Sequence, residues 1–130
     1  MCRDKMNNPK LLSPSTLAFV GDAVYELCVR GKIAEVERPV GELHKNSVEY
    51  VNANAQKNAY ELIKDILTET EMSIYKRGRN NHVGQIPKNS SSGAYHCATG
   101  VEALFGYLYL NGESERIEEL FSVIWRGISG

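Results

Sequence analysis

The stretch AYHCATGVEALFGYLYL, residues 94–110, determines the fold, because it is strongly apolar and long enough for about five helical turns. Its single acid is Glu102, and the pair Asn111-Gly112 that follows is typical of the end of a helix. No run of the chain approaches the roughly 18 apolar residues of a membrane span. We therefore expect residues 94–110 to form a largely buried helix of a globular domain.

Helical patterns cover most of the remaining sequence. A helix is predicted over residues 14–30, because Ser13-Pro14 is typical of a helix start and Gly31 of a stop. A last helix is predicted over residues 113–126. The apolar positions expected to face the core are Leu17, Val20, Val24, Leu27 and Cys28 in the first of these helices, and Ile117, Leu120, Phe121, Ile124 and Trp125 in the last.

Residues 42–67 are predicted to form one or two helices, with a break near Asn52 and Asn54. Thr68 and Glu71 have the spacing of a capping box, which begins a short helix leading into a basic cluster. Residues 80–93 are rich in Asn, Ser, Gly and Pro, which predicts a loop. The apolar face of the 42–67 region consists of Leu43, Val48, Val51, Ala55, Ala59, Leu62, Ile63 and Ile66.

The predicted fold class is all-α, with about six or seven helices in a single domain over residues 1–130 and a core over about 11–127. The 42% of hydrophobic and 24% of charged residues exclude a disordered chain. Cys2, Cys28 and Cys97 lack the spacing of a disulfide framework or a zinc site, which favours a reducing cytoplasm. The polar N-terminus lacks the apolar stretch of a secretory signal.

Charge is distributed unevenly along the sequence. Lys76, Arg77, Arg79 and Lys88 lie in a window without acids, which carries +4 in a chain of formal net charge −1, so the remainder carries −5. A basic segment on an acidic body predicts a localised contact with a polyanion. The alternative is a solvated loop whose basic residues only maintain solubility.

Two acids lie within apolar helices. Asp22 follows Gly21 in a helix interior, where glycine costs about 1 kcal/mol relative to alanine and aspartate competes with the helical backbone. Glu102 has apolar neighbours, and burying a lone carboxylate costs several kcal/mol unless it is paired or binds a metal. Two such helices predict a shared Mg²⁺ site. The alternative is that both acids face solvent or cap helices separately. Glu26, one turn after Asp22, either supplements the site or forms a surface ion pair.

Four segments carry a resemblance to a known family. Leu17–Glu26 (LAFVGDAVYE) resembles the signature of the ribonuclease III catalytic domain, and Thr99–Leu110 (TGVEALFGYLYL) resembles the second acidic motif of that family. Between them, Lys76–Asn80 (KRGRN) and Leu43–Lys45 (LHK) resemble the short branch called Mini-ribonuclease III (Mini-III), which lacks the double-stranded-RNA-binding domain. The resemblance implies the helical fold of the ribonuclease III catalytic domain.

The sequence departs from the full-length enzymes of this family at two acidic positions. Those enzymes place further acids around their metals where this chain has Ala18 and Thr99, so only Asp22 and Glu102 remain. The resemblance implies that these two are the catalytic and Mg²⁺-binding residues. The Thr99 hydroxyl and Glu26 are expected to support them.

The resemblance implies an Mg²⁺-dependent endoribonuclease that cuts double-stranded RNA, leaves 5′-phosphate ends and matures a stem of the 23S ribosomal RNA precursor. A ribosomal protein bound to that stem is an implied partner. Cutting both strands needs two sites, which predicts a homodimer whose interface involves Phe19, Tyr25 and the helix of Glu102. The alternative is that these two aromatic residues belong to the core. Contacts to the RNA backbone are expected from Lys76, Arg77, Arg79, Asn80 and Lys88, with additional contacts from His44 and Lys45.

Two other functions stay open from the sequence. The loss of two acids is compatible with a module of ribonuclease III fold that binds structured RNA without cleaving it. The other is a structural helical dimer whose basic loop contacts an acidic protein. Cleavage of duplex RNA separates the first from an enzyme, and the effect of charge reversal at Arg77 and Arg79 on RNA affinity separates the second.

Overall fold

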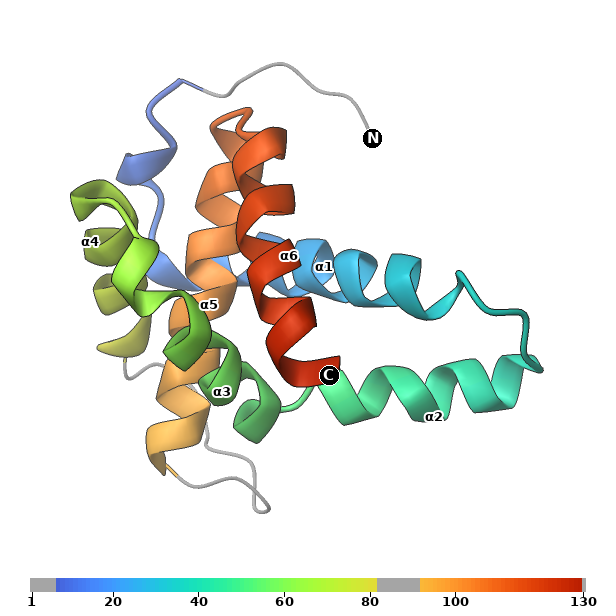
Figure 1. Ribbon diagram of the computed structural model, residues 1–130. Coiled ribbons are helices and arrows are strands. Elements are labelled where there is room, and N and C mark those ends of the chain that lie inside the picture. The colour runs from blue at the N-terminus through green and yellow to red at the C-terminus, as the bar shows by residue number, and fades with distance from the viewer. Residues whose placement is uncertain (1–6, 82–91, 130) are drawn as a thin grey trace.

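The computed structural model describes residues 7–81 and 92–129, which form six α-helices and no strand (Figure 1). The predicted fold class, all-α with six or seven helices, is confirmed for this part of the chain. Two short 3-10 turns precede α1 and follow α3. The helices are α1 (Pro14–Ile33), α2 (Val40–Tyr50), α3 (Ala53–Ile63), α4 (Glu69–Arg79), α5 (Ser92–Leu110) and α6 (Ser114–Ser129), and the turns are Pro9–Leu11 and Lys64–Ile66.

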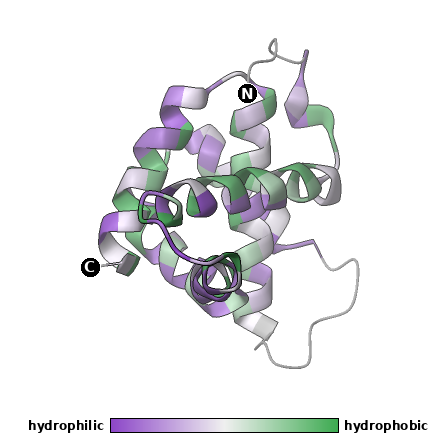
Figure 2. Ribbon diagram, turned by 90° about the vertical axis from the view of Figure 1, so that its right-hand side faces the viewer, coloured by the Kyte–Doolittle hydropathy of each residue, from purple (hydrophilic) through white to green (hydrophobic). Residues whose placement is uncertain are grey.

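Helix α5 is the centre of the molecule. In Figure 1 it runs vertically, with α1 crossing it and α6 beside it, while α3 and α4 lie on its other side. Residues 103–108 are all buried, which explains why this helix is apolar around its circumference. The ribbons of the surrounding helices alternate apolar and polar residues, as helices with one buried face do (Figure 2). Of the helices described, none has the length and apolar character to cross a bilayer.

Several helix limits follow from local signals in the sequence. The side chain of Ser13 accepts a hydrogen bond from the Thr16 N–H at 3.1 Å at the start of α1. The side chain of Asn52 accepts one from the Ala55 N–H at 2.9 Å, so the predicted break in the 42–67 region is confirmed. Gly112 follows α5 with a φ of 73°, a left-handed conformation that favours glycine and ends the helix.

The prediction that the first helix ends at Gly31 is wrong. Helix α1 continues to Ile33, whose side chain is only 5% exposed. Burying an isoleucine contributes about 2 kcal/mol, which exceeds the cost of about 1 kcal/mol for a glycine within a helix. Helix α5 also starts at Ser92, two residues before the predicted start, and α6 continues to Ser129.

The face that α1 turns to the core differs in part from the prediction. Leu27 is 55% exposed, and Val20 and Cys28 are only partly buried. The predicted stripe followed the largest aliphatic side chains, whereas the buried face is centred on a glycine that allows close packing. The buried residues of α1 are Leu17, Ala18, Gly21, Val24, Tyr25, Val29 and Ile33.

The other predicted core faces are confirmed for some residues and wrong for others. In α6, Ile124 and its apolar neighbours one turn apart are buried as expected, with Trp125 partly buried. In α3, Ala59 and Ile63 are buried. Val48, Leu62 and Ile66 were expected on the apolar face of the 42–67 region and are exposed. Val48 and Ile66 lie in α2 and in the turn after α3, which have few neighbours.

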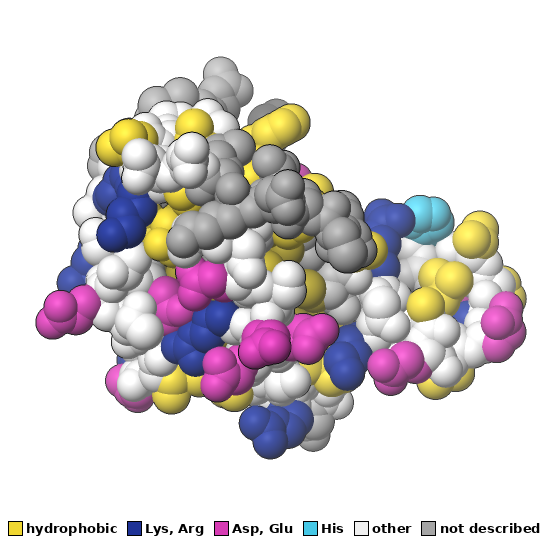
Figure 3. Space-filling model, turned by 90° about the horizontal axis from the view of Figure 1, so that it is seen from above, with side chains coloured by type: hydrophobic (Ala, Val, Ile, Leu, Met, Phe, Trp, Pro, Cys, Tyr) yellow, Lys and Arg dark blue, Asp and Glu magenta, His cyan; other side chains and the backbone are white. Residues whose placement is uncertain are grey.

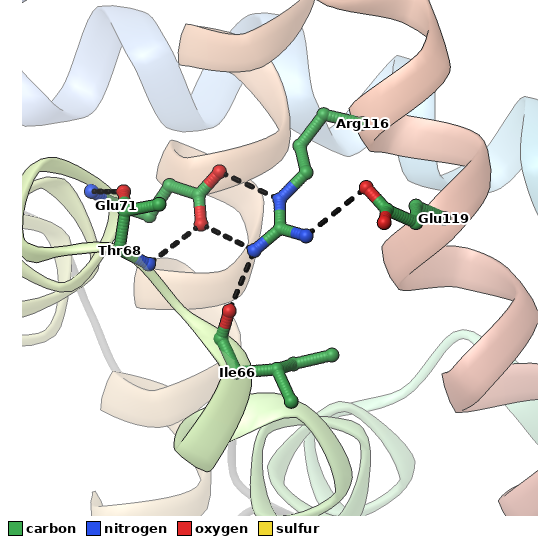
Figure 4. Close-up of polar contacts among 5 residues, drawn as sticks. All are labelled: Ile66, Thr68, Glu71, Arg116 and Glu119. Atoms are coloured by element: carbon green, nitrogen blue, oxygen red, sulfur yellow. Dashed lines mark hydrogen bonds and ion pairs between the residues drawn. The ribbon is translucent and has the colours of Figure 1, made fainter.

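An ion-pair network joins the start of α4 to the start of α6 (Figure 4). Glu71, 4% exposed, accepts hydrogen bonds from Nε and Nη2 of Arg116 at 2.9 and 2.8 Å. The Thr68 N–H donates to the same carboxylate and the Glu71 N–H donates to Thr68 Oγ1, which confirms the capping box. Arg116 also donates to the Ile66 carbonyl and the Glu119 carboxylate. Burial acts to raise the pKa of Glu71, but the hydrogen bonds from Arg116 and Thr68 outweigh it and hold this pKa below its ordinary value.

The end of α1 and the whole of α2 project from the body as an arm (Figure 1). In Figure 3, which views the molecule from above, the arm lies at the right and shows apolar, acidic and basic side chains next to one another. Val36, Val40 and Val48 are its exposed apolar residues. The arm therefore has a mixed surface without one dominant charge.

Candidate functional site

The crossing of α1 and α5 brings the two acid-bearing helices into backbone contact. A Cβ atom at Gly21 would collide with the carbonyl of Glu102, and a Cβ at Gly106 would collide with the carbonyl of Leu17. Both helices lack a side chain where they cross, so their axes approach more closely than two ordinary helices do. Asp22, which follows Gly21, is thereby carried to the neighbourhood of Glu102.

The side chains of Asp22 and Glu102 lie close enough to interact. Burial, the charge of Asp22 and a side-chain hydrogen bond with Asp22 together raise the pKa of Glu102 to about 8, with burial the largest of these causes. Asp22 is exposed, whereas Glu102 is mostly buried. The structure thus brings the two predicted site acids together, one facing solvent and one set into the protein.

A third helix contributes a side chain that the sequence analysis missed. Gln56 of α3 is 3% exposed, and its Nε2 donates to Oε2 of Glu102 at 3.5 Å. The hydrogen bond from Gln56 lowers the pKa of Glu102, against the larger effects of burial and Asp22. One signal was available, since Gln56, Ala59 and Ile63 share the helical spacing of a buried face and only the first of them is polar.

The donor set fits a hard divalent cation. Within residues 7–81 and 92–129, neither Asp22 nor Glu102 forms an ion pair with a basic side chain. Two adjacent carboxylates without a cation repel one another, and oxygen ligands are those that Mg²⁺ prefers. The same part of the chain contains no group of three or more His, Cys, Asp or Glu residues that could hold a metal. Water and substrate oxygens would therefore complete the coordination of an ion bound by this pair.

The remaining expected site residues near the pair have other partners. Ala18 is buried in the core, and the Thr99 hydroxyl donates to the Tyr95 carbonyl at 3.1 Å. Glu26 accepts a hydrogen bond from Nε of Arg30 at 3.1 Å, which is the surface ion pair given as its alternative role. Thr99 retains its oxygen lone pairs to accept a hydrogen bond.

The basic residues at the end of α4 differ in their engagement. Lys76 and Asn80 are exposed, and Arg79 lies with its guanidinium carbon 5.8 Å from the centre of the Tyr75 ring. Arg77 is occupied, because Nη1 and Nη2 donate to the carbonyls of Lys10 and Leu12, each at 2.9 Å. These two bonds fasten α4 to the segment before α1, so Arg77 has a structural role.

The expected RNA-binding residues do not form one surface. His44 and Lys45 are exposed on α2, within the arm. Figure 1 shows α2 and α4 on opposite sides of α5. Lys88 and most of the predicted loop over residues 80–93 lie outside the described residues.

The two aromatic residues expected at a dimer interface have different environments. Tyr25 is fully buried, with its ring in edge contact with Phe105 and Phe121 at 5.3 and 5.7 Å between centres, so its placement at an interface is wrong. Its spacing after Gly21 turns it to the core. Phe19 is 80% exposed, beside a shallow hollow that Ala23 and Tyr109 help to line.

Comparison with known proteins places these features in a family. A model of the Ribonuclease III domain matches residues 15–113. The chain is 50% identical to "Mini-ribonuclease 3" of Thermoanaerobacter sp. (strain X514) over 113 residues, which are 86% of this chain and 80% of that protein. It is 42% identical to "Mini-ribonuclease 3" of Brevibacillus brevis over 124 residues, which are 95% of this chain and 92% of that protein.

A solved structure is similar over nearly the full length of both chains. The crystal structure of a protein from Fusobacterium nucleatum matches with a TM-score of 0.84 at 30% sequence identity. The match covers 94% of this chain and 98% of that chain. The helical arrangement described above is therefore also that of an experimentally determined protein.

Proposed function

Since the chain belongs to the ribonuclease III family, in its short Mini-ribonuclease 3 branch, and is an endoribonuclease, we propose that it cleaves double-stranded RNA in an Mg²⁺-dependent reaction. The observation that carries the proposal is the close pair of Asp22 and Glu102, which has no basic partner among the described residues. A bound cation would relieve the repulsion between the two ionised carboxylates, and it would also compensate the charge of a phosphodiester substrate.

The two carboxylates have different tasks in this proposal. Glu102, mostly buried and held at the helix crossing, anchors the cation from the protein side. Asp22, exposed beside it, binds the same cation at the edge that an RNA phosphate reaches. When bound, Mg²⁺ supplies Lewis-acid activation of water and compensates charge on the phosphate. The products expected from attack by water are 5′-phosphate and 3′-hydroxyl ends.

Binding of the RNA backbone is proposed for the exposed basic end of α4. Lys76, Arg79 and Asn80 supply donors for phosphates and 2′-hydroxyls, which is how duplex RNA is mainly recognised. Lys88 continues the basic window along the chain. His44 and Lys45 would contact RNA from the arm, so a duplex that reaches both regions spans the molecule.

A homodimer is proposed because one site cuts one strand. Phe19 supports this, since it is 80% exposed next to an apolar hollow, and exposed apolar patches mark sites of protein interaction. The adjacent hollow, lined by Val20, Ala23 and Tyr109 among others, offers a place for the same side chain of a second copy. In a two-fold interface, Phe19 of each copy would face the hollow of the other copy.

The finer substrate and partner follow from the Mini-III resemblance. We propose a stem of the 23S ribosomal RNA precursor as the substrate in the cytoplasm, with a ribosomal protein bound to that stem as a helper. Cleavage of the naked stem and of the protein-bound stem, compared at equal enzyme concentration, tests this part separately. A faster reaction on the bound stem is the expected result, and equal rates would contradict the helper role.

The central proposal is tested by incubating a 5′-labelled RNA duplex with the protein in Mg²⁺ or in EDTA. Cleavage in Mg²⁺ alone, with 5′-phosphate ends, is the expected result. Asp22→Asn should bind the duplex without cutting it. The matched control is Glu61→Gln, which removes an exposed carboxylate from a surface ion pair with Lys64 and should cut normally. If the unmutated protein binds the duplex and leaves it intact in Mg²⁺, it is a binding module and the proposal is wrong.

A further inference from the structure

We propose that Gln56 is a positioning residue for Glu102, which holds one carboxylate oxygen in place so that the other faces the cation shared with Asp22. This inference rests on the proposed function, because it concerns the same pair of acids. It adds a third helix, α3, to a site that the motifs place on α1 and α5 alone.

The geometry of Gln56 points to this role. Its side chain is 3% exposed, and burying an amide is unfavourable unless the amide is hydrogen-bonded. Nε2 donates to Oε2 of Glu102 at 3.5 Å, across 46 positions of sequence. A buried amide directed at a carboxylate is therefore a built feature of the site.

The attachment of Gln56 is rigid. The residue lies in the first turn of α3, where its N–H donates to the carbonyl of Asn52 at 2.9 Å. The Asn52 side chain caps the same turn and also donates to the carbonyls of Val48 and Glu49 at the end of α2. A side chain on so firmly anchored a turn can restrict the rotation of Glu102, and a ligand restricted in advance loses less entropy on binding.

An amide suits this position better than another acid would. Glu102 already lies beside Asp22, and a third carboxylate would add repulsion when the cation is absent. An amide donates a hydrogen bond without adding charge. Since Ala18 and Thr99 supply no carboxylates, each of the two remaining acids has to be well oriented, and hydrogen-bonded partners of metal ligands commonly provide that orientation.

The test compares metal binding by the full chain without RNA, measured by calorimetry and by Mn²⁺ paramagnetic resonance. Gln56→Met keeps the length and removes the amide, and we expect about tenfold weaker Mn²⁺ affinity. Its thermal midpoint in EDTA should fall only slightly, since Glu102 loses one long hydrogen bond while the new side chain is apolar and buried. The Mg²⁺ concentration for half-maximal cleavage should rise by a similar factor, with a smaller change in the rate at saturating Mg²⁺. Asn58→Met, exposed on the same helix, is the matched control and should bind Mn²⁺ normally.

A second variant covers the case in which Gln56→Met does not fold. Gln56→Asn keeps the amide and withdraws it by one methylene, so it should weaken Mn²⁺ binding by the same factor. Wild-type affinity in either folded variant overturns the positioning role. If the unmutated protein cleaves RNA while these variants bind metal normally, only this inference fails. If the unmutated protein neither binds Mn²⁺ nor cleaves, the proposed function fails and this inference fails with it.

Discussion

Glu71 and Glu102 are both carboxylates withdrawn from water, and their surroundings act on them in opposite directions. Hydrogen bonds from Arg116 and Thr68 outweigh burial at Glu71 and lower its pKa. Burial and then the charge of Asp22 raise the pKa of Glu102 to about 8. The first carboxylate has its cation built into the fold, and the second lies beside another acid. The contrast separates an acid that stabilises the structure from an acid that is free to take a ligand.

The largest effect on activity is expected from a substitution of Glu102. Glu102→Gln should reduce cleavage about 1,000-fold, because a neutral amide is a poor ligand for a hard cation. The thermal midpoint in EDTA should rise, because repulsion with Asp22 disappears. Initial rates on duplex RNA and thermal melts check the two effects. A fall in the midpoint comparable to that of a core substitution would make Glu102 a structural residue like Glu71.

The opposite outcome is expected at Glu71. Glu71→Gln should destabilise the protein by about 3 kcal/mol, because Arg116 would be left partly buried without its partner. The rate of cleavage per folded molecule should stay the same. Urea unfolding measures the first quantity, and rates well below the midpoint measure the second. The double variant Glu71→Met with Arg116→Leu is the control, and it should recover most of the lost stability.

The pH dependence of stability sharpens the comparison further. The pKa of Glu102 is raised in the folded protein, so its carboxyl group loses its proton earlier in the unfolded chain. The protonated carboxyl group of Glu102 therefore contributes to the free energy of unfolding at a pH below its ordinary pKa. This contribution is lost as the pH rises from the ordinary pKa to about 8. We expect a loss of about 1–2 kcal/mol for the metal-free protein relative to Glu102→Gln, allowing for partial exposure.

Thermal melts of the two proteins in EDTA, from pH 5.5 to pH 9, measure this difference. Added Mg²⁺ should remove most of it, since the cation binds the ionised form. Parallel curves for the two proteins across the whole range would show that Glu102 ionises normally. Glu71 has a lowered pKa, so its contribution should instead be present above its ordinary pKa and be lost only in acid.

The smallest effect is expected for two basic side chains, one of which has partners within the protein and one of which is exposed. Arg77 is already bonded to the carbonyls of Lys10 and Leu12, whereas Lys76 is exposed. Lys76→Glu should weaken duplex-RNA binding and reduce its salt dependence by about one unit of slope. Arg77→Ala should lower the thermal midpoint and change that slope less. Binding titrations at several salt concentrations decide between them, and equal slopes for both variants would contradict the assignment.

The elements of the fold were predictable where local signals agree. These signals come from residues close together in sequence. They include the capping box of Thr68 and Glu71, the caps of α1 and α3, and the apolar helix α5. The pairing of Asp22 with Glu102 was predictable as well, since a lone acid in an apolar helix requires a partner.

The remaining features depend on packing between distant helices. Tyr25 faces the core because α1 packs on its glycine side, and hydrophobic spacing alone did not distinguish that side from the one carrying Leu27. The bonds of Arg77 join segments more than sixty positions apart. Gln56 reaches Glu102 only because α3 lies against α5. Such contacts follow from the fold and have no local signature.

The two glycines where α1 meets α5 have a consequence for the spacing of the two acids of the candidate site. The backbones of the two helices are in direct contact there, and this contact sets the separation of the two acids. Any larger side chain at Gly21 or Gly106 would push the helices apart. The pair of Asp22 and Glu102 therefore keeps its spacing although Ala18 and Thr99 add no further acids beside it. Replacing Gly21 or Gly106 with alanine would disturb the metal geometry while leaving every ligand in the sequence. The spacing of the two acids thus depends on the two smallest residues at the crossing as much as on the acids themselves.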